Sequence, residues 1–256
     1  MSIMDLGRRT FLAGLAPITI AGAVGAAGPL KLACANGFKP AMVRIAVALE
    51  APLRVDYDEG SVLLHRLATR DKPDVIIVPR SVLDPLLQHD VVPAGSVATL
   101  AATDVLGITI RPGDQLPATE SIEDFRRWLL GLRSIAVTDP AVGGPSVRQF
   151  LEVLERLGIA DDMKPKLIAV PGAGASNAQY VTSGRAQAAV QLSHLLHGIA
   201  AIEMVPVPSE FRGTVTFTAG VVAGSVNQDA AAALIRYLHG PVAAQAIEAS
   251  GMRRIP

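Results

Sequence analysis

Short, almost uninterrupted apolar runs alternate along this chain with segments whose apolar residues recur every three or four positions. The first pattern is typical of strands buried on both faces of a parallel sheet, and the second is typical of the helices that cover such a sheet. The alternation predicts an α/β fold with mainly parallel sheets flanked by helices. The expected strands are 30–35, 74–78, 106–110, 134–137, 166–170, 186–191 and 214–222. The expected helices are 39–49, 61–69, 121–132, 146–157, 227–238 and 241–249.

Residues 1–27 have the pattern of an export signal. Arg8 and Arg9 precede a short Gly- and Ala-rich apolar stretch that ends in small residues, which is typical of a twin-arginine signal peptide. The stretch is too short for a membrane span, and an anchor that is never cleaved is the alternative. We therefore expect a periplasmic protein that is exported by the twin-arginine route.

Composition excludes several classes of partner. The chain has 23 basic and 23 acidic residues, so it offers no basic surface to nucleic acid or to a membrane. Cys34 is the only cysteine, so no internal disulfide can form, and its apolar surroundings predict a buried strand residue. His194 and His197 are one helical turn apart, but no acidic residue or cysteine at ligand spacing completes a metal site. We expect no metal, no cofactor and a monomer.

Glycines and small polar residues follow several of the expected strands. In open α/β sheets, ligands bind beyond the carboxyl ends of the strands, where helix N-termini offer unpaired amides to an anion. Serines at these junctions are expected to cap the helices, and arginine binds a carboxylate with two parallel hydrogen bonds. The junctions are 36–37, 60–61, 139–146 and 172–177, the serines are Ser61, Ser146 and Ser176, and the nearest cations are Lys39, Arg80 and Arg148.

Four segments occur in a characteristic order, namely 30–37 (LKLACANG), 72–84 (KPDVIIVPRSVLD), 135–140 (IAVTDP) and 181–191 (VTSGRAQAAVQ). In this order they resemble the molybdate-binding-protein-like branch of the type II periplasmic solute-binding proteins. The resemblance implies two α/β lobes joined by crossing strands, with a small anion clamped between them. It implies a first lobe at 28–106 plus 212–256 and a second lobe at 107–211, and an ABC permease as the partner that receives the anion.

The resemblance also implies anion contacts from both lobes. The loop after the first strand matches Asn36 and Gly37, and the family's serine at the second helix start matches Ser61. In the second lobe the matches are the turn at 139–146 and the backbone around Gly174. With the cations and a glutamine at the end of one strand, the predicted ligand-binding residues are Asn36, Gly37, Lys39, Ser61, Arg80, Gly144, Ser146, Gly174 and Gln191.

Two departures weaken an assignment to molybdate. Molybdate binders place a tyrosine near the end of the strand that here reads 188–192, and they favour a serine where this chain has Asn36. The segments 139–144, 157–166 and 190–193 look more like a subgroup that includes periplasmic aconitate isomerases and binders of small organic acids. Three hypotheses stay open: a receptor for an oxyanion or a di- or tricarboxylate, an aconitate isomerase with His194 or Lys39 as proton carrier, and a periplasmic sensor.

Overall fold

A computed structural model of the protein describes residues 28–49, 52–67, 72–114, 116–117, 121–171 and 176–255. The predicted signal peptide and the predicted site residue Gly174 lie outside these ranges. The strands are β1 (Leu30–Ala35), β2 (Leu53–Asp58), β3 (Val75–Pro79), β4 (Val97–Asp104), β5 (Gly107–Ile110), β6 (Ile135–Thr138), β7 (Leu167–Val170), β8 (Ala188–Gln191), β9 (Glu203–Val205), β10 (Thr214–Val221) and β11 (Arg253–Arg254).

Apolar residues at helical spacing produce helices that pack on these strands. The α-helices are α1 (Lys39–Ala48), α2 (Gly60–Arg66), α3 (Arg80–Gln88), α4 (Ile122–Gly131), α5 (Pro145–Arg156), α6 (Ala160–Met163), α7 (Ala178–Thr182), α8 (Ser193–Leu196), α9 (Gln228–Leu238) and α10 (Pro241–Glu248). Short 3₁₀ helices are η1 (Asn36–Phe38), η2 (Ala94–Ser96), η3 (Lys164–Lys166) and η4 (Ser209–Phe211).

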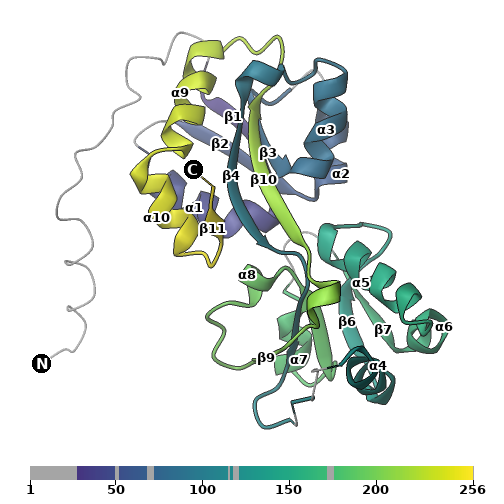
Figure 1. Cartoon of the computed structure of the whole chain (residues 1–256). Helices are drawn as coiled ribbons and strands as arrows, with labels where there is room; N and C mark the ends of the chain where they lie inside the picture. Colours follow the sequence, from purple (N-terminus) through teal and green to yellow (C-terminus); the bar gives the residue numbers. More distant parts are fainter. Residues whose placement is uncertain are drawn as a thin grey trace, which may run out of the picture.

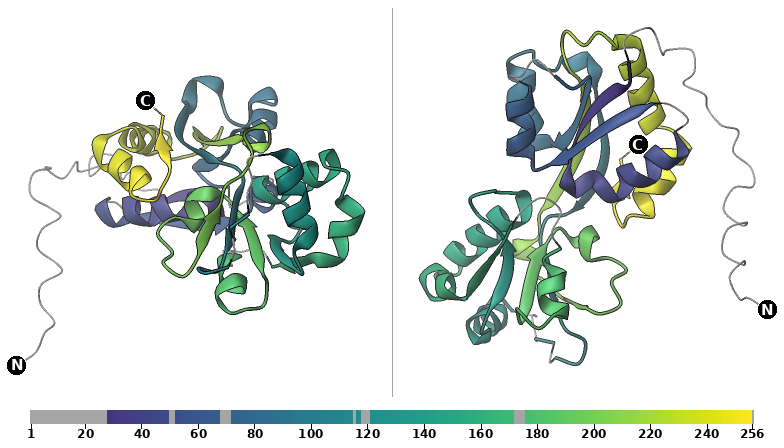
Figure 2. Two further views of the ribbon diagram at one scale, coloured as in Figure 1. Left: turned by 60° about the horizontal axis from the view of Figure 1, so that its bottom comes forward. Right: turned by 180° about the vertical axis from the view of Figure 1, so that it is seen from behind.

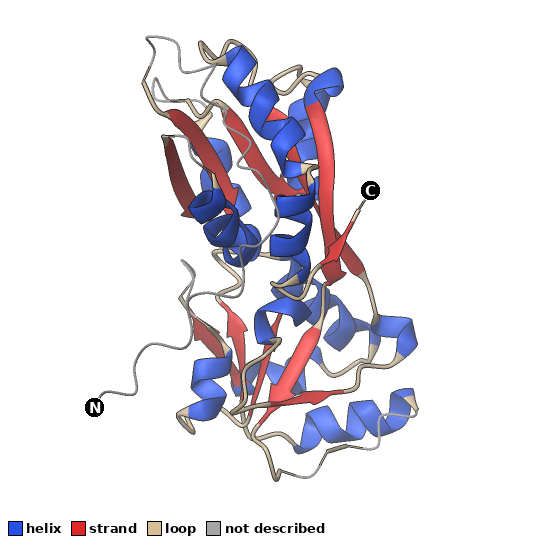
Figure 3. Cartoon of the chain, turned by 90° about the vertical axis from the view of Figure 1, so that its left-hand side faces the viewer, coloured by secondary structure: helices blue, strands red, loops and turns tan. Residues whose placement is uncertain are grey.

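The strands form two separate sheets, and each sheet is the centre of one lobe (Figures 1 and 3). Lobe 1 contains the sheet β11-β4-β10-β3-β1-β2, with α1, α9 and α10 on one face and α2 and α3 on the other. Lobe 2 contains the sheet β7-β6-β8-β5-β9, with α4, α5 and α6 on one face and α7 and α8 on the other (Figure 2). The predicted two-lobed α/β fold is confirmed.

The expectation of mainly parallel sheets holds for only part of each sheet. Pairing is parallel within β2-β1-β3 and within β7-β6-β8. By contrast, β10 is antiparallel to both β3 and β4, and β5 is antiparallel to both β8 and β9. The reason is the crossing between the lobes: β4 carries the chain out of lobe 1 and β10 brings it back, so the two run in opposite directions.

The two crossing segments, the end of β4 and the start of β10, are hydrogen-bonded to each other and connect the lobes (Figure 1). Thr214 of β10 pairs with Asp104 of β4, and the amide of Val105 donates a 2.9 Å hydrogen bond to the carbonyl of Gly213. A paired double crossing of this kind is where a hinge motion of two lobes would bend. The predicted boundaries between the lobes, near 106 and 212, stay a prediction.

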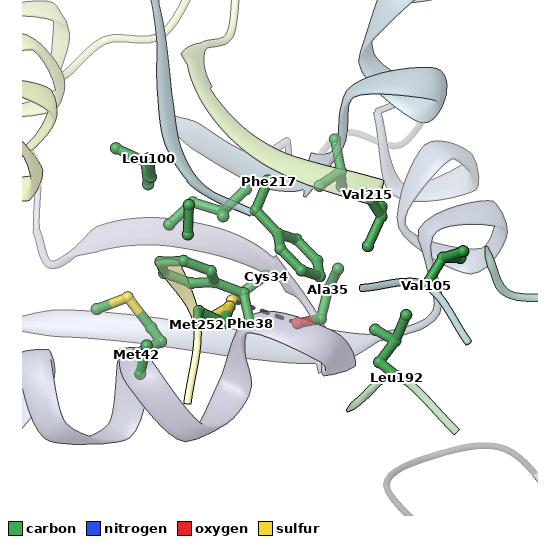
Figure 4. Packing of buried hydrophobic residues seen from close by; sticks show 14 of the residues in the cluster. Cys34, Ala35, Phe38, Met42, Leu100, Val105, Leu192, Val215, Phe217 and Met252 are labelled. Atoms are coloured by element: carbon green, nitrogen blue, oxygen red, sulfur yellow. Dashed lines mark hydrogen bonds between the residues drawn. The ribbon is translucent and has the colours of Figure 1, made fainter. Parts of the chain in front are cut away.

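Aromatic and aliphatic side chains fill the space where this connection meets β1 (Figure 4). The rings of Phe38 and Phe217 are buried with their centroids 5.6 Å apart, and Leu192 of lobe 2 belongs to the same apolar cluster. Gly37 lies against this cluster so closely that a Cβ atom would sit 2.6 Å from Cζ of Phe217. Cys34 is fully buried in β1, as predicted, and its burial raises the pKa of the thiol far above the ordinary range.

Candidate ligand-binding site

A cleft of about 780 Å³ lies between the lobes. Its lobe 1 wall comes from the end of β1 with η1, the start of α1, the β2–α2 junction and the start of α3. Its lobe 2 wall comes from the turn between β6 and α5, the first residues of α5 and the end of β8. These are carboxyl ends of strands and N-termini of helices, where open α/β sheets bind ligands. The volume is that of a pocket for a small organic molecule.

Most of the predicted site residues are brought together at this cleft. The lining includes the predicted residues Asn36, Gly37, Lys39, Ser61, Gly144, Ser146 and Gln191. Residues far apart in the chain thus meet because each follows a strand whose carboxyl end faces the gap between the lobes. Their role as ligand contacts stays a prediction.

Arg80 is the predicted residue that the fold places elsewhere. Its Nε pairs with Oδ1 of Asp84, one turn further along α3, at 2.6 Å. It lines a neighbouring hollow of about 250 Å³, and Arg148 lines both that hollow and the cleft. Nε of the guanidinium that the sequence suggested for an anion is therefore paired with a carboxylate on its own helix.

Three cationic side chains line the cleft itself, namely Lys39 and Arg44 from α1 and Arg148 from α5. Within the described part of the chain, none of the three forms an ion pair. Nζ of Lys39 lies 5.1 Å from the centre of the Tyr57 ring. Sequence reasoning missed Arg44 because it lies inside a helix, away from the strand–helix junctions. The walls therefore carry three cations that form no ion pair with any carboxylate of the described ranges.

Contrary to the prediction, Ser61, Ser146 and Ser176 are not the N-cap residues of their helices. The N-cap residues of α2, α5 and α7 are Glu59, Gly144 and Asn177, and none of their side chains accepts a capping hydrogen bond. The hydroxyl of Ser61 instead donates a 3.3 Å hydrogen bond to the carbonyl of Val142, which links the two lobes across the cleft. Gly144 adopts φ 128° and has no side chain to offer, so the first amides of α5 lack a side-chain cap.

A carboxylate that sequence reasoning missed also lines the cleft. Oε1 of Glu59 accepts a 3.2 Å hydrogen bond from Nδ2 of Asn36. Burial raises the pKa of Glu59, the hydrogen bond from Asn36 lowers it, and the neighbouring Asp58 raises it. The signal in the sequence was an acidic residue placed directly between β2 and the Gly60-Ser61 junction.

His194 connects the lobes and lies away from the cleft lining. From α8 it reaches into lobe 1, where Nε2 lies 2.7 Å from the carbonyl oxygen of Gly37 and Nδ1 lies 3.1 Å from the hydroxyl of Thr103. Because a carbonyl only accepts, Nε2 carries the hydrogen and Nδ1 accepts from Thr103. Burial lowers the pKa of His194 to about 4. The neutral imidazole, with a hydrogen bond at each ring nitrogen, holds the Gly37 loop of the cleft in place and does not serve as a catalytic base in the cleft.

Within the described ranges, no three His, Cys, Asp or Glu side chains are grouped so that they could hold a metal ion. None of the described helices is both long enough and apolar enough to cross a membrane.

Two α/β lobes, a paired double crossing and a polar cleft between the lobes define the class of two-lobed periplasmic binding proteins of type II. Residues 30–253 match the model of the bacterial extracellular solute-binding protein family, so the chain belongs to that family. An aconitate isomerase from a Pseudomonas species is 28% identical over 204 residues, which cover 78% of this chain and 74% of the relative.

Solved structures show the same fold. The periplasmic molybdate-binding protein of Azotobacter vinelandii has a TM-score of 0.68 and 17% identity, and the match covers 89% of this chain and 99% of that one. The substrate-binding domain of a putative molybdenum ABC transporter from Clostridium difficile has a TM-score of 0.63 and 19% identity, with the same coverage of both chains. At this identity the likeness concerns the fold.

Proposed function

We propose that this protein is a periplasmic solute-binding protein that holds a small di- or tricarboxylate between its lobes and delivers it to an ABC permease. The observation that carries the proposal is the set of unpaired cations in the cleft, Lys39, Arg44 and Arg148. Guanidinium groups bind carboxylates with two parallel hydrogen bonds, and charged hydrogen bonds are the strong ones. The first turn of α5 adds amides at the positive end of a helix.

The shape and lining of the cleft favour an organic anion over an inorganic oxyanion. Apolar side chains such as Val43, Val82 and Leu195 share the walls with the polar groups. A tetrahedral oxyanion would use few of these surfaces, whereas the carbon skeleton of a polycarboxylate would cover them. Asn36, which stands where molybdate binders favour a serine, supports the same choice.

Calorimetry on the purified protein tests the proposal directly. We expect citrate or trans-aconitate to bind with a measurable heat and to raise the melting temperature. Molybdate and sulfate provide the comparison with inorganic oxyanions. Absence of binding by every one of these anions would contradict the receptor function, and binding of molybdate alone would replace the organic ligand with an oxyanion.

A second candidate function is that of an aconitate isomerase in the periplasm. The specific observation in its favour is the relative from Pseudomonas, which bears that name and resembles most of this chain. The reaction moves a double bond in an unsaturated tricarboxylate, so it requires the same cationic cleft and, in addition, a group that carries a proton.

A further inference from the structure

Glu59 is the cleft residue whose presence a purely anion-binding site does not explain. It adds negative charge to a wall that would face an anion, and like charges brought close to one another are costly. It does not serve as a capping side chain for α2, although it occupies the N-cap position. A carboxylate at this position is better explained by proton transfer than by anion binding.

The two oxygens of Glu59 are held in different ways. Oε1 accepts the hydrogen bond from Asn36, whereas Oε2 accepts none from any residue that the structure describes. Oε2 points across the cleft toward lobe 2, since a Cβ atom on Gly144 would lie 3.7 Å from it and would meet no other atom within 4 Å. One oxygen is thus anchored by an amide, and the other faces the opposite wall of the cleft.

From this geometry we infer that Glu59 is the acid–base residue of the cleft and moves a proton between two carbons of a bound unsaturated polycarboxylate. The inference rests on the second candidate function, the isomerase, and shares with the receptor function only the binding of a polycarboxylate by the cationic walls. Catalytic proton carriers of this kind contribute about 10² to 10⁴ in rate. His194, which is buried outside the cleft lining, does not enter the step.

The step balances without any other reactant. For trans-aconitate, Oε2 takes a proton from the CH₂ group, and that C–H electron pair becomes delocalised over the three-carbon unit and its carboxylates. The neutral Glu59 carboxyl then returns the proton to the carbon at the other end of the unit. The double bond shifts by one position, cis-aconitate forms, and the Glu59 carboxylate is restored. Lys39, Arg44 and Arg148 would stabilise the negative charge that develops on the ligand.

The surroundings of Glu59 suit a residue that both takes and returns a proton. Asp58 of β2 adjoins it, and Lys39 and Arg44 from α1 and Arg148 from α5 line the same cleft. Burial, its largest influence, raises its pKa, and a nearby ligand carboxylate would raise it further. A carboxyl group whose pKa is raised toward neutrality is better matched to proton transfer at the working pH than an ordinary one.

Proton NMR of the full-length protein with trans-aconitate in D₂O tests the inference, together with calorimetry of the same samples. We expect wild type to form cis-aconitate and Glu59→Gln to lose this activity by about 100-fold or more while it still binds trans-aconitate. The amide that replaces the carboxylate would keep an oxygen that can accept from Asn36, so the fold is expected to persist. Glu155→Gln, which changes an exposed glutamate on the far part of α5, is the matched control and should keep the wild-type rate.

Asn36→Ala provides a readout that a merely structural role would not change. Without the hydrogen bond that lowers it, the pKa of Glu59 rises, so the acidic limb of the rate profile should move to higher pH. Binding of trans-aconitate by wild type with neither isomerisation nor deuterium incorporation would overturn the inference and leave the receptor function standing. A wild-type rate in Glu59→Gln would overturn it too, and absence of both binding and turnover would overturn both proposals.

Discussion

Replacing Gly37 with alanine tests how tightly the first loop of the cleft is fixed to the core. The new Cβ atom would lie 2.6 Å from Cζ of Phe217 and 3.0 Å from Cδ1 of Leu192. Phe217 is 1% exposed and cannot swing into solvent. Overpacking of a well-filled core costs about 1 to 3 kcal/mol, which for a chain of this size lowers the melting temperature by about 2 to 12 °C.

Thermal and urea unfolding of four variants measure this cost and assign it to its cause. Phe217→Leu alone should cost about 1 to 2 kcal/mol because it leaves a cavity. The double variant Gly37→Ala/Phe217→Leu should cost less than the sum of the two single changes by at least about 0.5 kcal/mol, since the methyl group then enters the space that the ring has left.

Gly131→Ala is the matched control for the glycine change. Gly131 ends α4, and a Cβ atom there would meet nothing within 4 Å, so alanine should be neutral or stabilising by up to about 1 kcal/mol. Strict additivity in the double variant, or a Gly37→Ala protein as stable as wild type, would refute the packing at the lobe junction described above.

Three further outcomes follow from the same contacts. The folded-state pKa of His194, about 4, is below its unfolded value of 6.5, so the contribution of His194 to stability is complete above pH 6.5 and falls by about 3 kcal/mol as the pH drops to 4. In urea titrations, His194→Gln should remove this part of the loss of stability at acidic pH. An unchanged pH dependence of stability in this variant would contradict the argument. Arg148→Gln should weaken citrate or trans-aconitate binding about 10- to 100-fold in calorimetry, whereas Arg133→Gln, an exposed cation outside the cleft lining, should bind like wild type; equal affinities of the two variants would exclude Arg148 as a contact. Asp74→Ala should lower the free energy of unfolding by about 3 kcal/mol, because buried Asp74 accepts from three donors, among them Oγ of Ser225 at 2.6 Å; a loss below about 1 kcal/mol would contradict this role.

Local patterns were sufficient where an element carries its own signal. The apolar run of β1 ends at Ala35 as predicted, and α5 begins at the Gly-Gly-Pro turn and ends just before Gly158. β4 was missed because its sequence, VATLAATD, is made of small and moderately polar residues. Its strand structure comes from pairing with β10, more than a hundred residues away, which no local window contains.

The residues of the candidate site also fall into two groups, those that a local sequence rule predicts and those that only the folded arrangement brings to the cleft. Asn36 and Ser61 follow strands, and the rule that ligands bind beyond strand ends finds them. Arg44 and Glu59 reach the cleft because of where α1 and the β2–α2 junction face after folding. For Arg80, the position directly after β3 suggested a ligand contact, but in the folded protein its Nε pairs with Asp84 on the same helix.

The position of β10 in the first sheet determines the order in which the lobes can be completed. The last strand of the second sheet, β9, has been synthesised once Val205 is made, so lobe 2 can assemble all its strands while the rest of the chain is still missing. β3 and β4 are not neighbours, because β10 lies between them. Until residues 214–221 leave the ribosome, these two strands keep open edges that invite wrong pairing. The lobe that begins the chain is therefore the last to close.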